Sequence, residues 1–110
     1  MEGEVNELSS ATARGHLADY FKALGHPTRL QIVELLREGE KCVCEIIPAL
    51  QMEQSNISRH LAILKKEGIL SSEKRGLKVI YACKNKDVYR MIDLSKAILS
   101  AYWNERRITI

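Results

Sequence analysis

Two cysteines separated by one residue are the side chains of this sequence best suited to chemistry. Cys42 and Cys44 lie in the stretch EKCVCEIIP, and Cys83 is the third and last cysteine. Thiolates bind soft ions such as trivalent arsenic or antimony, cadmium, lead and copper(I), and the same thiols can close a disulfide or take up sulfur. Metal binding, redox chemistry and plain burial are therefore the interpretations open for these cysteines.

Local backbone geometry decides whether the first two cysteines can act together. Residues two apart on a regular helix point about 200° away from each other, so Cys42 and Cys44 can grip one ion only where the chain between them is extended or unwound. We expect a short extended segment at 41–43, followed by a brief helix over 44–50. Pro48 is tolerable there because it falls in about the first turn.

Apolar spacing and helix-boundary residues predict a mainly helical α+β chain with one hairpin. Gly25 ends one helix and Pro27 suits the first turn of the next. After Gly68 the apolar period changes from helical to alternating, with the hairpin tip at Arg75 and Gly76. The expected helices span residues 12–24, 27–37, 44–50, 54–67 and 87–105, and the expected strands span residues 69–74 and 79–84.

The size and charge of the chain limit its function. The 110 residues fit one domain, 1–110, with a flexible N-terminal arm over 1–11, and a core drawn from 45% hydrophobic residues would benefit from a second subunit. No apolar run approaches the roughly 20 residues that cross a bilayer, so we expect a cytoplasmic protein that does not contact membranes. Residues 59–86 hold eight basic side chains and two acidic ones, which is the footprint of a phosphate-backbone binder.

The order of these elements is that of a winged helix-turn-helix with a two-stranded β wing. The second helix of such a motif enters the major groove, and the stretch QSNISRH supplies short polar side chains near its start. His60 is the ambiguous member, because it can contact DNA or pack on the neighbouring helix. The candidate DNA-contacting residues are Gln54, Ser55, Asn56, Ser58, Arg59, His60, Lys65, Lys74, Arg75 and Lys78.

The stretches LGHPTRLQIVELL, KCVCEI, QSNISRHLAILKKEGIL and SEKRGLKVIYA resemble the ArsR/SmtB family of homodimeric metal-sensing repressors. The resemblance covers about residues 17–105. It implies a winged helix dimer, joined through its first and last helices, that occupies a palindromic double-stranded operator and leaves it when an inducer binds. No cofactor is expected to be needed for folding. The expected interface residues are Leu17, Tyr20, Val88, Met91, Ile92, Ser95, Ile98, Leu99 and Tyr102.

The cysteines place the chain within that family. Cys42 and Cys44 match the Cys-Val-Cys motif of the arsenical and cadmium/lead repressors, and Glu45 stands at the motif's acidic position. The chain departs from the arsenical pattern at Ile47, where a further cysteine is expected, and from the cadmium pattern because residues 1–41 contain no cysteine. Residues 87–110 contain no histidine, so a zinc site on the last helix is rejected.

These observations leave three possible functions, which differ in how the cysteines are used. If the segment before the helix-turn-helix pairs with the second wing strand, Cys83 would approach Cys42 and Cys44, giving a three-thiolate site for arsenite, antimonite, cadmium, lead or copper(I). The same thiols could instead form the disulfide of a redox or reactive-sulfur sensor, and a constitutive DNA-binding module would use neither. No enzymatic activity is expected, because no histidine lies close in sequence to the thiols and no phosphate-binding loop is present.

Overall fold

The computed structural model describes residues 10–105, which form helices around a small sheet. The elements run α2 (Ala11–Leu24), α3 (Pro27–Leu35), β1 (Lys41–Cys42), α4 (Val43–Leu50), α5 (Gln54–Lys66), β2 (Leu70–Arg75), β3 (Lys78–Cys83) and α6 (Asp87–Glu105). The order and bounds agree closely with the expected elements. Most of the N-terminal arm expected over 1–11 lies outside the described residues and stays a prediction.

Local capping explains where the first helices begin. The Ser10 hydroxyl accepts a hydrogen bond from the Ala13 N–H and starts α2. His26 starts α3, because its Nδ1 accepts from the Thr28 N–H at 3.1 Å and Pro27 occupies the first helical position.

Helix α4 differs from its expected form at Pro48. The helix begins at Val43, so Pro48 is its sixth residue rather than a member of its first turn. Because proline has no N–H, the Cys44 carbonyl lacks its helical donor, and the start of α4 is held by fewer backbone hydrogen bonds than a regular helix.

The sheet has the strand order β1-β3-β2, and both strand pairs are antiparallel. β2 and β3 form the hairpin, which is closed by Gly76 and Leu77 rather than by Arg75 and Gly76, because Arg75 still pairs with Lys78. Gly76 has a φ of 63°, a conformation that glycine adopts without strain. The expected pairing of the segment before α4 with the second wing strand is confirmed, with Cys42 opposite Ile80.

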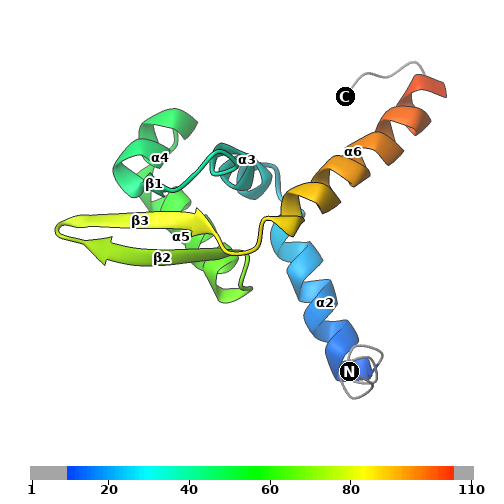
Figure 1. Cartoon of the computed structure of the whole chain (residues 1–110), viewed down its shortest axis with the longest axis horizontal. Helices are drawn as coiled ribbons and strands as arrows, with labels where there is room; N and C mark the ends of the chain where they lie inside the picture. The colour runs from blue at the N-terminus through cyan, green and yellow to red at the C-terminus, as the bar shows by residue number, and fades with distance from the viewer. Residues whose placement is uncertain (1–9, 106–110) are drawn as a thin grey trace.

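The core lies between α3, α4, α5 and the start of the hairpin. Its fully buried side chains include Ile32, Ile46, Ile57, Leu61 and Leu64. Only the end of α2 and the beginning of α6 join it, and the rest of these two helices diverges from the body on the side away from the hairpin tip (Figure 1). The three helices α3, α4 and α5 and the hairpin thus form a winged helix-turn-helix body that carries two projecting helices.

Polar contacts with α3 anchor the first half of α6. The Tyr89 hydroxyl donates to the Val33 carbonyl at 2.8 Å, and the Arg37 guanidinium lies over the Tyr89 ring. Arg37 also bridges Glu34 and Asp93, and its hydrogen bonds lower the pKa of Glu34 to about 2. Lys96 adds an ion pair with Glu34 at 3.0 Å, so the polar contacts with α3 and the residues after it reach the middle of α6.

Candidate functional site

The exposed face of α5 carries most of the expected DNA-contacting residues. Ser55 and Arg59 lie one helical turn apart and both are exposed, while Ile57 and Leu61 face the core. Arg59 donates a 2.5 Å hydrogen bond to the side-chain oxygen of Asn56. Glu53, the residue before the helix, makes no side-chain cap, so the first N–H groups of α5 do not donate to its carboxylate.

His60 does not lie with this polar face. Its ring packs on that of His26 with centroids 4.5 Å apart, and its Nδ1 accepts from Arg29 at 3.1 Å. Burial, followed by the nearby His26 and two arginines, lowers the pKa of His60. These contacts agree with the alternative that His60 packs on the neighbouring helix, and its contact with DNA stays a prediction.

The basic side chains of the wing differ in whether they form ion pairs. Arg75 is paired with the carboxylates of Glu40 and Glu73, and these hydrogen bonds raise its pKa. Lys74 and Lys78 are exposed and have no ion pair among the described residues. The sequence offered no signal for the contact between Arg75 and Glu40, because the two residues lie 35 positions apart.

Lys65 is separated from the start of α5. It lies in the last turn of the helix, about 16 Å along the axis from Gln54 at 1.5 Å per residue. A cation at this end complements the negative pole of the helix dipole, which gives Lys65 a structural role of its own. The structure therefore does not gather it with the polar side chains of the first turns.

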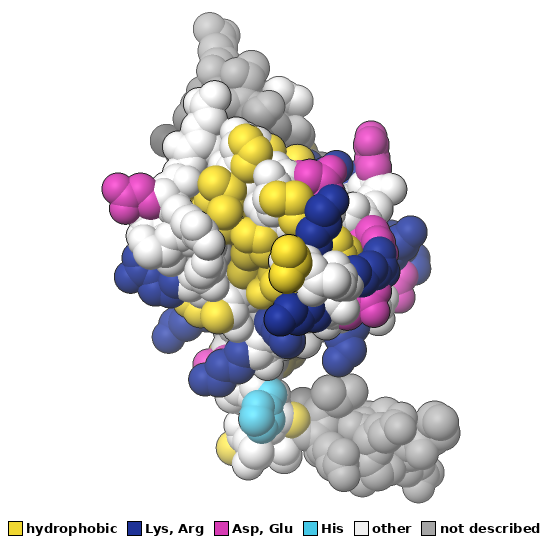
Figure 2. Space-filling model, turned by 90° about the vertical axis from the view of Figure 1, so that its left-hand side faces the viewer, with side chains coloured by type: hydrophobic (Ala, Val, Ile, Leu, Met, Phe, Trp, Pro, Cys, Tyr) yellow, Lys and Arg dark blue, Asp and Glu magenta, His cyan; other side chains and the backbone are white. Residues whose placement is uncertain are grey.

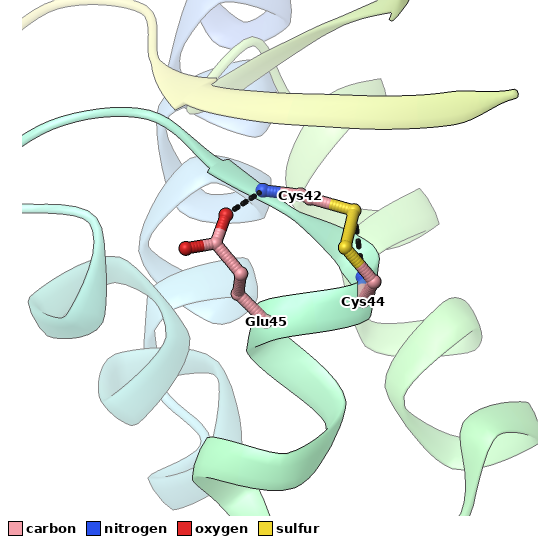
Figure 3. The surroundings of a disulfide bond; sticks show 3 residues. All are labelled: Cys42, Cys44 and Glu45. Carbon is pink, nitrogen blue, oxygen red and sulfur yellow. Dashed lines mark hydrogen bonds between the residues drawn. A yellow bond between two sulfur atoms is a disulfide. The ribbon is translucent and has the colours of Figure 1, made fainter. Parts of the chain in front are cut away.

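Cys42 and Cys44 converge at the start of α4 and form a disulfide (Figure 3). Their Cα atoms are 5.0 Å apart, because Cys42 has extended backbone while Cys44 is already helical. The Cys44 N–H donates to the Cys42 sulfur at 2.9 Å, and the Glu45 carboxylate accepts from the Cys42 N–H at 2.9 Å. This reciprocal cap fixes the approach of the two sulfurs, as the requirement for an unwound segment predicted.

The structure does not bring Cys83 to this pair. Cys83 lies three residues beyond Ile80, the partner of Cys42, which is about 10 Å along the strand. The odd offset directs its side chain to the other face of the sheet, where its sulfur donates to the Asn85 carbonyl and interacts with Tyr89. No group of three metal-binding side chains occurs among residues 10–105, so the expected three-thiolate site within one subunit is wrong for this conformation.

A groove lies between the disulfide, helix α5 and the wing formed by β2 and β3. It has a volume of about 360 Å³. Cys44 borders it on one side, Gln54 and Ser58 of α5 on a second, and Lys78 on a third. Figure 2 views the molecule from the side of the hairpin tip and shows hydrophobic side chains at the centre, with basic and acidic side chains around them. The two cysteines and three candidate DNA-contacting residues, Gln54, Ser58 and Lys78, thus border a single space.

The exposed apolar side chains of the projecting helices α2 and α6 overlap only in part with the expected dimer interface. Val88 and Ile92 are 4% and 8% exposed because they fill the subunit's own core, which leaves little of either side chain for a partner; their place in the interface stays a prediction. Sequence reasoning missed Phe21 and Leu94, which are 51% and 63% exposed. The expected residues that stay exposed on these helices are Leu17, Ser95, Ile98, Leu99 and Tyr102, whereas Tyr20 and Met91 are half-buried.

A second groove of about 420 Å³ lies between α2, α3 and α6. Phe21, Leu30 and Leu99 are among its lining residues, and each of these side chains is exposed. None of the helices in the described part of the chain is both long and apolar enough to cross a membrane.

Comparison with known proteins identifies the class of this architecture. Residues 26–72 match the model of the family described as bacterial regulatory protein, arsR family. An uncharacterized HTH-type transcriptional regulator of Methanocaldococcus jannaschii is 45% identical over 80 residues, which cover 69% of this chain and 90% of that protein. The cadmium resistance transcriptional regulatory protein CadC of Listeria innocua is 35% identical over 97 residues, covering 84% and 82% of the two chains.

Three further comparisons concern an arsenical repressor and two solved structures. The arsenical resistance operon repressor of Escherichia coli is 52% identical over 62 residues, covering 56% of this chain and 53% of the repressor. The homodimeric winged helix-turn-helix DNA-binding domain of Mb0332 from Mycobacterium bovis superposes with a TM-score of 0.77 at 29% identity, covering 86% of this chain and 88% of that domain. Rv0081 of Mycobacterium tuberculosis gives a TM-score of 0.79 at 28% identity, covering 89% and 98%.

Proposed function

The chain belongs to the arsR family of bacterial regulatory proteins, and we propose that it is a homodimeric repressor that leaves its operator when Cys42 and Cys44 bind a soft metalloid such as arsenite. As a member of that family it is a DNA-binding transcriptional regulator rather than an enzyme. The observation that carries the proposal is the convergence of the two sulfurs beside Gln54 and Ser58 in one groove.

DNA would be held by α5 and the wing of each subunit. Ser55, Asn56 and Arg59 present hydroxyl, amide and guanidinium groups that suit base edges and phosphates in a major groove. Lys74 and Lys78 would contact the flanking backbone. A dimer would place two such surfaces on a palindromic operator, because the symmetry of the protein is matched by that of its site.

Two thiolates suffice to capture arsenite. Each thiol displaces one hydroxide of arsenous acid as water, which leaves arsenic bound to two sulfurs and one hydroxyl. Because the ion would occupy the groove that Gln54 and Ser58 line, binding should alter the position of α5. An inducer that prefers the altered state lowers the affinity of the protein for its operator. DNA lowers the affinity for the inducer by the same factor.

A redox function is the second candidate, and the disulfide between Cys42 and Cys44 favours it. Closing this bond joins the same two sulfurs that a metalloid would bridge. The two candidates therefore use one site and differ in their trigger: a ligand in the first and an oxidant in the second.

The experiment begins with selection of a DNA site from a random-sequence library by the reduced protein. Fluorescence anisotropy at fixed salt then measures affinity for that DNA with the reduced protein alone, with arsenite, with cadmium, and after mild oxidation. Arsenite should weaken binding at least about tenfold if the coupling is of ordinary size. Release by oxidation alone, reversed by reductant, would select the redox candidate, and release by none of these treatments would refute both.

Cys42→Ser isolates the role of the thiol pair. Serine is a favoured N-cap residue, which is the position of Cys42 before α4, so the variant should keep α4 and bind the selected DNA. Its response to arsenite should be lost because only one thiol remains at the site. Cys83→Ser is the matched control and should respond like the native protein; loss of DNA binding by folded Cys42→Ser would contradict the sensor role.

A further inference from the structure

The two sulfurs of the disulfide differ in access. Both cysteines line the groove beside Gln54, Ser58 and Lys78, but Cys42 is only 4% exposed whereas Cys44 is exposed. A thiol arriving from solvent therefore reaches the Cys44 sulfur more readily than the Cys42 sulfur.

The local hydrogen bonds also favour attack on Cys44. Such an attack expels Cys42 as a thiolate, and the Cys44 N–H already donates to the Cys42 sulfur at 2.9 Å. Cys42 is also the N-cap residue of the eight-residue helix α4, where the positive pole of the helix dipole stabilises an anion. A stabilised thiolate is the better leaving group in thiol–disulfide exchange.

We propose that Cys44 is a site of S-thiolation, at which a small anionic thiol enters the groove and forms a mixed disulfide beside Gln54 and Ser58. In this step the incoming thiolate bonds to the Cys44 sulfur, the bond between Cys42 and Cys44 breaks, and Cys42 leaves as a thiolate that takes up the proton lost by the incoming thiol. The inference rests on the proposed function, since it assigns a further ligand class to the same thiol pair.

The charge of the groove indicates which thiols fit. Lys78 is the only charged side chain among its lining residues, and the remainder are apolar or neutral. A carboxylate on the incoming thiol would lie near this ammonium group. The volume of about 360 Å³ falls in the range of small-molecule sites, so the adduct can be accommodated without opening the domain.

The adduct would act on DNA binding by occupying space. Gln54 and Ser58 belong to the first turns of α5 and line the same groove as Cys44. A group attached to Cys44 therefore lies where these side chains must move to meet base edges. Thiolation should weaken DNA binding even though no metal is present.

The first test measures how thiol charge affects the reaction. Purified protein with an intact disulfide is treated with 3-mercaptopropionate, 2-mercaptoethanol or cysteamine, quenched with acid and alkylated, and the adduct is located by mass spectrometry. The rate of each reagent with the native protein is divided by its rate with the Lys78→Gln variant, so that the intrinsic reactivity of the reagent cancels. The ratio should be about two to three for mercaptopropionate, close to one for mercaptoethanol and below one for cysteamine. Adduct on Cys42, or equal ratios for the three reagents, would overturn the proposal.

The second test isolates the effect on DNA. In Cys42→Ser the adduct is stable, because no neighbouring thiol can expel it; the Cys44 thiolate attacks the oxidised dimer of mercaptopropionate and releases one mercaptopropionate thiolate. Affinity for the selected DNA should fall at least about tenfold when the adduct forms and recover when reductant removes it. Affinity that stays within twofold would overturn the inference. Cys42→Ser lacks the thiol pair for arsenite, so this readout is independent of the proposed induction by arsenite, which is tested on the native protein.

Discussion

His60 shows how a single side chain can lie in a DNA-reading sequence and also serve packing. It lies in the stretch QSNISRH, yet its Nδ1 accepts a hydrogen bond from Arg29, a residue of α3. An arginine can only donate, so this contact requires His60 to be neutral. Burial beside His26 and Arg29 lowers the pKa of His60, which keeps it neutral at physiological pH.

The pH dependence of stability should reveal this contact. Because the pKa of His60 is lower in the folded chain than the ordinary 6.5, the unfolded chain binds more protons between the two values, and stability rises with pH across that window. The contribution is complete above about pH 6.5 and is lost on acidification toward the folded pKa. We expect His60→Gln, whose amide oxygen can still accept from Arg29, to lose less stability than the native protein between pH 7.5 and 5.5. Urea unfolding at fixed protein concentration measures this, and equal losses would contradict the assignment.

The wing shows how ion pairs divide the basic residues of one element. Arg75 and Lys78 face each other across the two-residue turn, and both belong to the predicted DNA-binding set. Arg75 is already paired with Glu40 and Glu73, while Lys78 is not paired with any described residue. A phosphate must compete with two carboxylates for Arg75 but with solvent alone for Lys78.

Salt dependence of DNA binding separates the two residues. Lys78→Gln should reduce the slope of log affinity against log salt by about 0.9 per subunit, because one phosphate contact is lost. Arg75→Gln should change the slope less. Glu40→Gln is the informative control, since it leaves Arg75 with the Glu73 carboxylate alone and should strengthen binding at low salt. Equal slope changes for Arg75→Gln and Lys78→Gln, measured by anisotropy, would show that the ion pairs open on DNA.

The whole molecule is more extended than its length requires. The Cα radius of gyration is 16.1 Å, whereas a compact chain of this length has about 13 Å. The excess comes from α2 and α6, which diverge from the winged body (Figure 1). Six large apolar side chains exposed on these two helices are Leu17, Phe21, Leu94, Ile98, Leu99 and Tyr102. An apolar surface of this kind on two projecting helices supports the proposed contact with a second copy.

Charge placed on this surface should separate the subunits. Ile98→Glu introduces a carboxylate at a side chain that is 63% exposed, so each subunit should still fold while a dimer would have to bury two unpaired charges. Sedimentation velocity should then find monomer where the native protein is dimeric. Leu77→Glu is the matched control, because Leu77 is 99% exposed in the turn at the wing tip, on the opposite side of the molecule from α6 (Figure 1). If both variants sediment like the native protein, α6 is not the interface.

The sequence by itself determined the elements and much of the site. Apolar period, capping residues and the Gly25 and Pro27 boundary fix helices through interactions within a few residues, so the bounds could be predicted to within about two positions. The geometric condition on Cys42 and Cys44 was equally local. It required that the segment holding the two cysteines not be regular helix throughout, and the extended backbone of Cys42 meets this condition.

Tertiary structure alone decided which distant residues meet. The strand register sets Cys83 three residues past the partner of Cys42, and an odd offset changes the face of the sheet. The pairing of Arg75 with Glu40 and the burial of Val88 and Ile92 likewise depend on how elements dock. Sequence period identifies an apolar face but not the surface that covers it, because a core and a subunit interface bury the same kinds of side chain.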